Sequence, residues 1–188
     1  MNVLDRNAHH ALAVAGLLAM PCHDHARFDP NRPLLASLLA GQRLGEGCLP
    51  PDLGLDERTC RQLINEYFTG LLMPAFPRST DKVPEWSDVQ KLLLDHRAGQ
   101  HASELWVADI IATACTGADH LWQDLGLPTR DVLGSLMADH FPSLVRANRP
   151  AMRWKKFFYR ELCQEDGGLV CRAPSCDVCS SYAECFVS

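Results

Sequence analysis

The segment SELWVADIIATACTG, residues 103–117, is the one that we expect at the centre of the fold. Its apolar side chains recur every three or four residues, at Leu105, Ala108, Ile111 and Ala112, which is the spacing of one face of an α-helix. Ser103 is a favourable residue before a helix, and Gly117 is a favourable residue after one. The sequence therefore predicts a central helix that begins at Ser103 and ends at Gly117.

Helical spacing also dominates on both sides of this segment, so we predict an all-α helical bundle. Asp5 is expected to cap a first amphipathic helix, with Leu12, Ala15, Leu18 and Ala19 on its apolar face. The other expected helices run from about Asn31 to Gly41, from Asp56 to Gly70, from Trp86 to His96, from Pro128–Thr129 onward, and over residues 151–164. Loops are expected at residues 45–54 and 74–84, and a short turn at residues 120–125.

Composition and charge exclude several classes of protein. The chain has 188 residues, 47 % of them hydrophobic and 22 % charged, which is typical of a globular protein. Its net charge of −5 gives no reason to expect nucleic-acid binding. The apolar run at residues 11–20 is shorter than the roughly 20 residues that cross a bilayer. Because no positive segment precedes it, we expect no signal peptide, no membrane partner and a cytoplasmic location.

Nine cysteines are present, and four of them lie close together at the end of the chain. Cys171, Cys176, Cys179 and Cys185 have the spacing C-x4-C-x2-C-x5-C, in a segment that follows Gly167–Gly168 and has no helical period. The sequence thus predicts a helical domain over residues 1–165 and a short irregular cysteine-rich tail over residues 166–188. Four thiols in so short a tail indicate a metal site, because coordination can stabilise a segment with little apolar area.

The spacing leaves the identity of the metal open. Iron–sulfur clusters take four thiolates at compact, uneven spacings like this one, and we favour them. Zinc also takes four thiolates, usually from two close pairs separated by a longer loop. Redox-active or unbound thiols are the remaining alternative.

Three motifs of the chain resemble the NifQ family of nitrogen-fixation proteins. One is RWKKFFYR at Arg153–Arg160, followed by Cys163; the second is the cysteine tail, which contains APSCD at Ala173–Asp177. The third is HLWQDLGL at His120–Leu127. The resemblance is close over residues 103–188 and looser over the first hundred residues.

This resemblance implies a molybdenum-handling role in making the iron–molybdenum cofactor of nitrogenase. It implies an iron–sulfur protein that carries molybdenum in a cluster of the Mo–Fe–S or [4Fe-4S] type and delivers it to the assembly machinery. The four tail cysteines would be the cluster ligands. The expected partners are the cofactor-assembly scaffold, the nitrogenase iron protein and molybdate. An iron–sulfur electron carrier and an interaction module stapled by zinc are the alternatives.

A basic stripe precedes the tail and supplies two further candidate residues. Residues 146–160 contain six basic residues and no acid, although the chain as a whole is acidic. On a helical wheel Trp154, Phe157, Phe158 and Leu162 form a core face, while Arg153, Lys156 and Arg160 lie together and Cys163 borders them. The stripe is either a solvated face or a surface that attracts molybdate or neutralises an anionic cluster.

Cys163 could be an additional ligand whose pKa nearby cations lower, or it could be a buried thiol. His120, next to Asp119 at an expected helix start, could be a capping residue or a ligand of iron or molybdenum. Cys48, Cys60 and Cys115 are expected to pack as small apolar residues. Because phosphate-binding loops and nucleophile motifs are not evident, we expect a metal carrier and not an enzyme.

Overall fold

The computed structural model describes residues 3–73, 84–149 and 151–165, and this part of the chain forms ten helices and no strand. The prediction of an all-α fold is therefore confirmed for the described residues, while the predicted tail and most of the loop at residues 74–84 lie outside them. The helices are α1 (Val3–Leu18), α2 (Asp24–Arg27), α3 (Arg32–Arg43), α4 (Glu57–Tyr67), α5 (Pro84–Asp95), α6 (Glu104–Ala114), α7 (Leu121–Asp124), α8 (Arg130–His140), α9 (Pro142–Ala147) and α10 (Trp154–Glu165).

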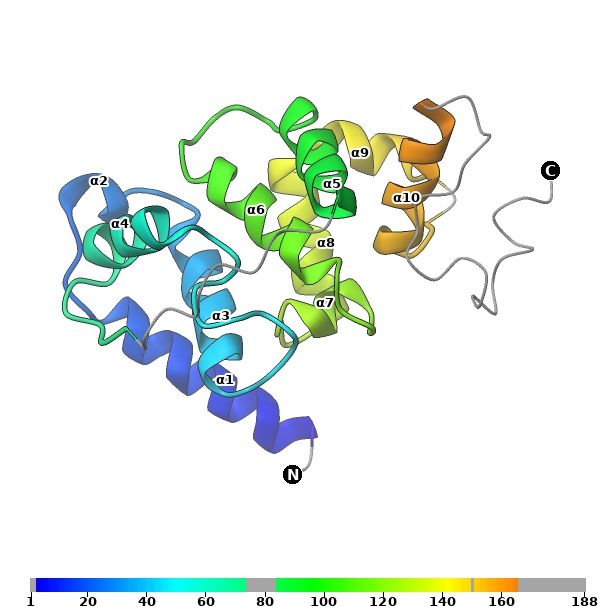
Figure 1. The fold of residues 1–188 in the computed structure, drawn as a ribbon. Coiled ribbons are helices and arrows are strands. Elements are labelled where there is room, and N and C mark those ends of the chain that lie inside the picture. The colour runs from blue at the N-terminus through cyan, green and yellow to red at the C-terminus, as the bar shows by residue number, and fades with distance from the viewer. Residues whose placement is uncertain (1–2, 74–83, 150, 166–188) are drawn as a thin grey trace.

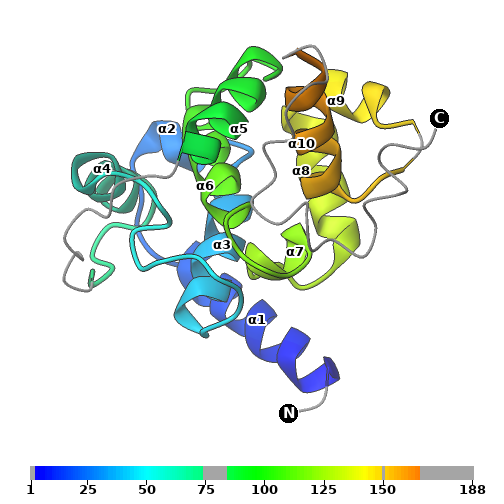
Figure 2. The same cartoon turned by 45° about the vertical axis from the view of Figure 1, so that its right-hand side comes forward.

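The helices α5 and α6 lie in the middle of the molecule, between two groups of helices (Figure 1). One group contains α1 to α4, in which α1 packs along α3 and α2 contacts α4. The other contains α8, α9 and α10, and Figure 2 shows α4 and α10 on opposite sides of α5 and α6. The predicted central helix is confirmed as α6, because Val107, Ala108, Ile110 and Ile111 are completely buried in it.

Local sequence signals place several helix starts correctly. Asp56 is the N-cap of α4, where its Oδ1 accepts a hydrogen bond of 3.0 Å from the Thr59 N–H. Thr129 caps α8 through a 3.4 Å bond from the Val132 N–H. The predicted face of α4 is also confirmed, since all of its members are buried: Cys60, Leu63, Ile64, Tyr67 and Phe68.

The predicted face of the first helix is wrong. The helix α1 begins at Val3, so Asp5 lies within its first turn and is not its N-cap. Leu12 is 72 % exposed, and the side that packs on α3 carries His10 and Leu17. His10 is buried because Ser37 and Glu46 satisfy its two ring nitrogens at 3.0 and 3.1 Å. The sequence of α1 is apolar around most of its circumference and hence does not distinguish the two faces.

Other differences are smaller. Leu105 in α6 is 45 % exposed and was expected in the core. The helix α3 continues through Gly41 to Arg43, and α10 begins at Trp154 instead of Ala151. The expected turn at residues 120–125 contains the four-residue helix α7, and the short helices α2 and α9 were not predicted.

A hydrogen-bonded cluster of buried polar groups joins α4 and α6 to the segment before α3. The Asp29 carboxylate accepts bonds from the Tyr67 hydroxyl, the Ser103 hydroxyl (2.7 Å) and the Asn31 N–H (2.8 Å). Burial favours a higher pKa for Asp29, but these bonds outweigh it and hold the pKa below its ordinary value. Burial of the ring, together with the same carboxylate, raises the pKa of Tyr67.

The turn after α7 packs directly on the end of α3, backbone against backbone. A Cβ atom on Gly41 would lie 2.3 Å from the Gly126 carbonyl oxygen, and one on Gly126 would lie 2.6 Å from the Glu46 carbonyl oxygen. Gly126 also has a φ of 67°, in the left-handed region that favours glycine. These two glycines thus allow the two halves of the molecule to approach closely.

No helix among residues 3–73, 84–149 and 151–165 is long and apolar enough to cross a membrane.

Candidate functional site

The predicted ligands divide into two groups. Cys171, Cys176, Cys179 and Cys185 lie outside the described residues, so the four-thiolate site stays a prediction. Cys163 and His120 are described, and they lie on α10 and at the start of α7. Within the described part of the chain, no three His, Cys, Asp or Glu side chains are grouped so that they could hold a metal ion.

His120 is the N-cap of α7 and is exposed. Its backbone N–H donates to Gln123 Oε1 at 3.3 Å, and its carbonyl oxygen accepts bonds from the N–H groups of Gln123 and Asp124. The prediction that it starts a helix is therefore confirmed. Its imidazole remains a candidate ligand for a metal held elsewhere in the protein.

Cys163 is buried on α10. The predicted core residues Phe157, Phe158 and Leu162 are buried as well, and Tyr159 joins them. The buried face of α10 is thus wider than the predicted one and includes Cys163. This position agrees with the interpretation of Cys163 as a buried thiol, and its role as an extra ligand stays a prediction.

A buried ion pair joins two of the segments that carry the motifs. The Lys155 ammonium of α10 donates to Asp124 Oδ2 of α7, and also to the Gly117 carbonyl oxygen at 2.9 Å. The exposed fraction of the side chain is 5 % for Asp124 and 16 % for Lys155. Because a buried charge is stable only when it is paired and hydrogen-bonded, this pair fixes the position of α10 relative to α7.

Asp124 connects further elements to the same point. Its Oδ2 accepts a 3.0 Å bond from the Asp119 N–H, in the turn that precedes His120, and its carbonyl oxygen accepts a 2.9 Å bond from the Cys48 N–H. A Cβ atom on Gly117 would lie 2.5 Å from Asp124 Cγ and 2.6 Å from Cys48 Sγ. The turn therefore requires a glycine here, and the cluster of Cys48, Gly117, Asp124 and Lys155 positions His120.

Three of the described cysteines, Cys48, Cys60 and Cys115, have pKa values that make them unreactive. Burial, with a contribution from the Asp124 carboxylate, raises the pKa of Cys48 to about 11. Burial also raises the pKa of Cys115 and of Cys60 to about 12 each. Cys60 and Cys115 are buried as predicted, whereas Cys48 is exposed by its total area, so the prediction that it packs as a small apolar residue is wrong. Thiols with such pKa values carry little thiolate at neutral pH and are poor ligands or nucleophiles as they stand.

The predicted basic stripe has two parts with different surroundings. Lys155 belongs to the ion pair with Asp124, while Arg153 is exposed and Arg160 is half-buried. Arg160 reaches back along the helix, so that its Nη1 lies 3.1 Å from Met152 Sδ. The signal that could have identified Asp124 and Lys155 was their place in two of the motifs, but only the folded chain shows that they contact each other.

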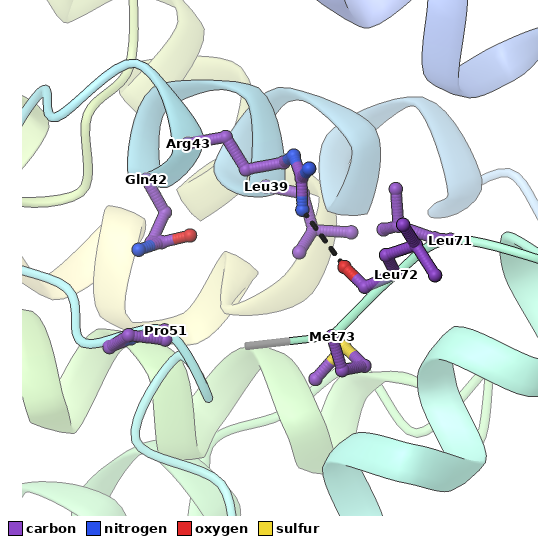
Figure 3. Close-up of a pocket in the computed structure, with 7 residues that line it drawn as sticks. All are labelled: Leu39, Gln42, Arg43, Pro51, Leu71, Leu72 and Met73. Carbon is purple, nitrogen blue, oxygen red and sulfur yellow. Dashed lines mark hydrogen bonds between the residues drawn. The ribbon is translucent and has the colours of Figure 1, made fainter. Parts of the chain in front are cut away.

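A separate cavity of about 290 Å³ lies between α3 and the segment after α4 (Figure 3). Its walls are mainly apolar and include Leu39, Leu71 and Met73. The polar side chain of Arg43 donates to the Leu72 carbonyl oxygen at 3.3 Å. Because none of the predicted site residues lines this cavity, we do not place the candidate site there.

Comparison with known proteins identifies the family. A profile of the NifQ family matches residues 34–187, which extends beyond the segment that carries the three motifs. The chain is 42 % identical over 179 residues to protein NifQ of Azotobacter vinelandii, covering 87 % of this chain and 90 % of that protein. It is 38 % identical over 156 residues to protein NifQ of Rhodobacter capsulatus, covering 81 % and 86 %. It is also 41 % identical over 149 residues to a NifQ homolog of Sinorhizobium fredii, covering 77 % and 64 %. No solved structure matches the chain. The chain belongs to the NifQ family, which is involved in nitrogen fixation.

Proposed function

We propose that this protein is an iron–sulfur molybdenum carrier that supplies molybdenum, as a Mo–Fe–S cluster, for synthesis of the iron–molybdenum cofactor of nitrogenase. The observation that carries the proposal is the coincidence of two features. The chain belongs to a nitrogen-fixation family, and it ends in four cysteines at the spacing C-x4-C-x2-C-x5-C.

The donor set fits such a cargo. Four cysteines within 15 residues supply the thiolates that iron–sulfur clusters use, and thiolates are also suitable ligands for soft metals. Cys171, Cys176, Cys179 and Cys185 would hold the cluster, and His120 and Cys163 are the next candidates as ligands. A cluster bound by four thiolates carries net negative charge, which the basic residues of α10 would offset.

The rest of the proposed role follows from carriage of a cluster. The protein would work in the cytoplasm, accept molybdenum that originates from molybdate, and deliver it to the cofactor-assembly scaffold, with the nitrogenase iron protein as a second partner. Its own residues would bind and release the cluster, so we propose a carrier and not a catalyst. The buried Asp124–Lys155 ion pair supports this scheme by keeping α7 and α10 in place.

Metal analysis of the protein after anaerobic isolation tests the proposal. We expect a brown protein that contains iron, sulfide and molybdenum, and expect a combined substitution of the four tail cysteines by serine to abolish all three. Cys22→Ser is the matched control, because Cys22 is a half-buried thiol outside the tail. A colourless protein with one zinc would instead support an interaction module. Iron and sulfide with a reversible redox couple and no molybdenum would support an electron carrier.

A further inference from the structure

Arg160 has donor groups that the described residues do not satisfy. Its Nε is buried and has no hydrogen-bond partner among residues 3–73, 84–149 and 151–165. Its Nη1 faces Met152 Sδ at 3.1 Å, and a thioether sulfur is a weak acceptor. Among the residues that the structure describes, only Nη2 has an oxygen acceptor, Glu161 Oε1 at 3.2 Å. A buried N–H without an acceptor destabilises the fold, so an anion that reached it and accepted from it would be bound favourably.

The guanidinium group is held in place although its hydrogen bonds are incomplete. It lies over the Phe157 ring, with the guanidinium carbon 5.9 Å from the ring centre. Met152 fixes its other end, and Met152 is itself fixed by Asn148. The Asn148 side chain accepts a 2.9 Å bond from the Met152 N–H and donates a 3.0 Å bond to the Met152 carbonyl oxygen. A cation with a fixed position and incompletely satisfied donors is suited to bind an anion that displaces the weakly accepting Met152 thioether.

Two more arginines lie at the same short connection between α9 and α10. Arg149 lies inside the segment that the Asn148–Met152 bonds close, and Arg153 directly follows it. Both are exposed, and they bring two more positive charges to the connection that Arg160 reaches. Ala151 in this connection has a φ of 52°, which is unusual for a residue other than glycine. The Asn148–Met152 bonds thus hold Met152, directly before Arg153, close to the end of α9.

From this arrangement we propose that Arg160, with Arg153 and Arg149, binds a tetrahedral oxyanion on the surface of the α9–α10 connection. The planar guanidinium offers parallel N–H groups that match two oxygens of such an ion, and a dianion is favoured because the three arginine charges outnumber the one Glu161 carboxylate beside Arg160. On the basis of the proposed function, the ion is molybdate, held here before its molybdenum reaches the thiolates of the tail. The proposed site binds the ion through N–H groups of arginine and uses none of the tail cysteines.

Equilibrium dialysis of the reduced, metal-free full chain against molybdate, at low ionic strength, tests this site. We expect saturable binding of one ion. Arg160→Gln should raise Kd about tenfold or more, because it removes the charge and the paired donors. Arg160→Lys should raise Kd by less, because the charge remains while the paired donors are lost. Arg153→Gln, a substitution of an exposed residue that leaves the core untouched, should raise Kd about threefold.

Two control variants separate this site from general electrostatics and from the tail. Arg58→Gln on α4 removes the same charge on the opposite side of the molecule and should leave Kd unchanged (Figure 2). The variant with all four tail cysteines changed to serine should also bind molybdate as the natural chain does. Equal Kd values for the natural chain and Arg160→Gln would overturn the inference, and so would loss of binding in the variant without tail cysteines.

Competition with sulfate and phosphate tests the identity of the ion. Displacement by molybdate and tungstate at lower concentrations than by sulfate or phosphate supports the assignment to molybdate. Equal displacement by all four ions would overturn that assignment. Failure of the proposed function would be seen independently, as the lack of iron and molybdenum in protein isolated anaerobically, while the dialysis would still report on the arginines.

Discussion

Replacement of Asp124 by asparagine should destabilise the protein without changing its fold. The substitution removes the anionic partner of the Lys155 ammonium in a site where only 16 % of its side chain is exposed, and leaves the Gly117 carbonyl oxygen and the new amide oxygen as neutral acceptors. A hydrogen bond between charged groups contributes about 1.5–3 kcal/mol, and the loss of one partner of a fully buried pair costs about 3–5 kcal/mol. Because Gly117 remains and Lys155 is partly hydrated, we expect a loss of about 2–3 kcal/mol in the free energy of unfolding.

Urea denaturation followed by circular dichroism at 222 nm measures this loss. For a chain of this length the expected loss corresponds to a decrease in Tm of about 5–10 °C. Asp119→Asn is the matched control, because it removes the same charge from an exposed side chain. Asp119 contacts Asp124 through its backbone N–H, which the substitution leaves in place. This control should change the free energy of unfolding by less than about 0.5 kcal/mol.

A double-mutant cycle distinguishes the ion pair from general damage to the core. Lys155→Met removes the ammonium and keeps much of the apolar side chain, so Asp124→Asn should cost much less in its presence. We expect a coupling energy of about 1.5 kcal/mol or more between the two positions. A coupling energy near zero, or a loss below about 0.5 kcal/mol for Asp124→Asn alone, would refute the conclusion that this pair holds α7 and α10 together.

Three further predictions concern other parts of the fold. Gly126→Ala should lower the free energy of unfolding by at least about 2 kcal/mol, because φ is positive at this position and the new Cβ would meet the Glu46 carbonyl oxygen. Gly134→Ala is the control in the same urea assay and should be neutral or stabilising, because Gly134 has open space around it. Iodoacetamide at pH 8 should leave Cys60 and Cys115 unmodified, because burial and their raised pKa values suppress the thiolate. Peptide mapping measures the labelling, and labelling of the folded protein as fast as in urea would contradict the prediction. The low pKa of Asp29 stabilises the folded chain above the unfolded-state value of about 3.9, and this contribution is lost as the pH falls through the lower folded-state value. The stability difference between the natural chain and Asp29→Asn should therefore be constant from pH 7 to about 5 and decrease below about pH 4; an equal difference at pH 6 and pH 2.5 would show that Asp29 is not the responsible group.

Local signals in the sequence were sufficient for most helix starts and for the central helix. Asp56 and Thr129 form their caps with residues three positions away, so their role depends on neighbours in the chain and can be recognised there. The face of α1 could not be predicted in the same way. His10 is buried because Ser37 and Glu46, which are distant in sequence, satisfy its ring nitrogens, whereas Leu12 stays 72 % exposed although it is apolar.

The candidate site shows the same division. Residue types and spacing were enough to predict the four-thiolate tail and the family, and the family is confirmed. The contact between Asp124 and Lys155 depends on a close approach between segments 31 residues apart. The surroundings of the other basic residues of α10 likewise depend on the folded chain. A helical wheel gives the direction of a side chain but not its partner, so it could not show that Lys155 enters an ion pair while Arg160 keeps unused donors.

The contact between Gly41 and Gly126 has a consequence for dissection of this protein into fragments. The three motifs lie within residues 103–188, which invites expression of that half alone. In the intact chain, however, the turn after α7 packs against the backbone of α3, and Ser103 hydrogen-bonds to Asn31 and Asp29. A fragment that begins near residue 100 would therefore expose apolar and polar surfaces that only the first half covers. We expect it to be insoluble by itself and to be recovered by co-expression with residues 1–99, as two pieces that assemble into one particle.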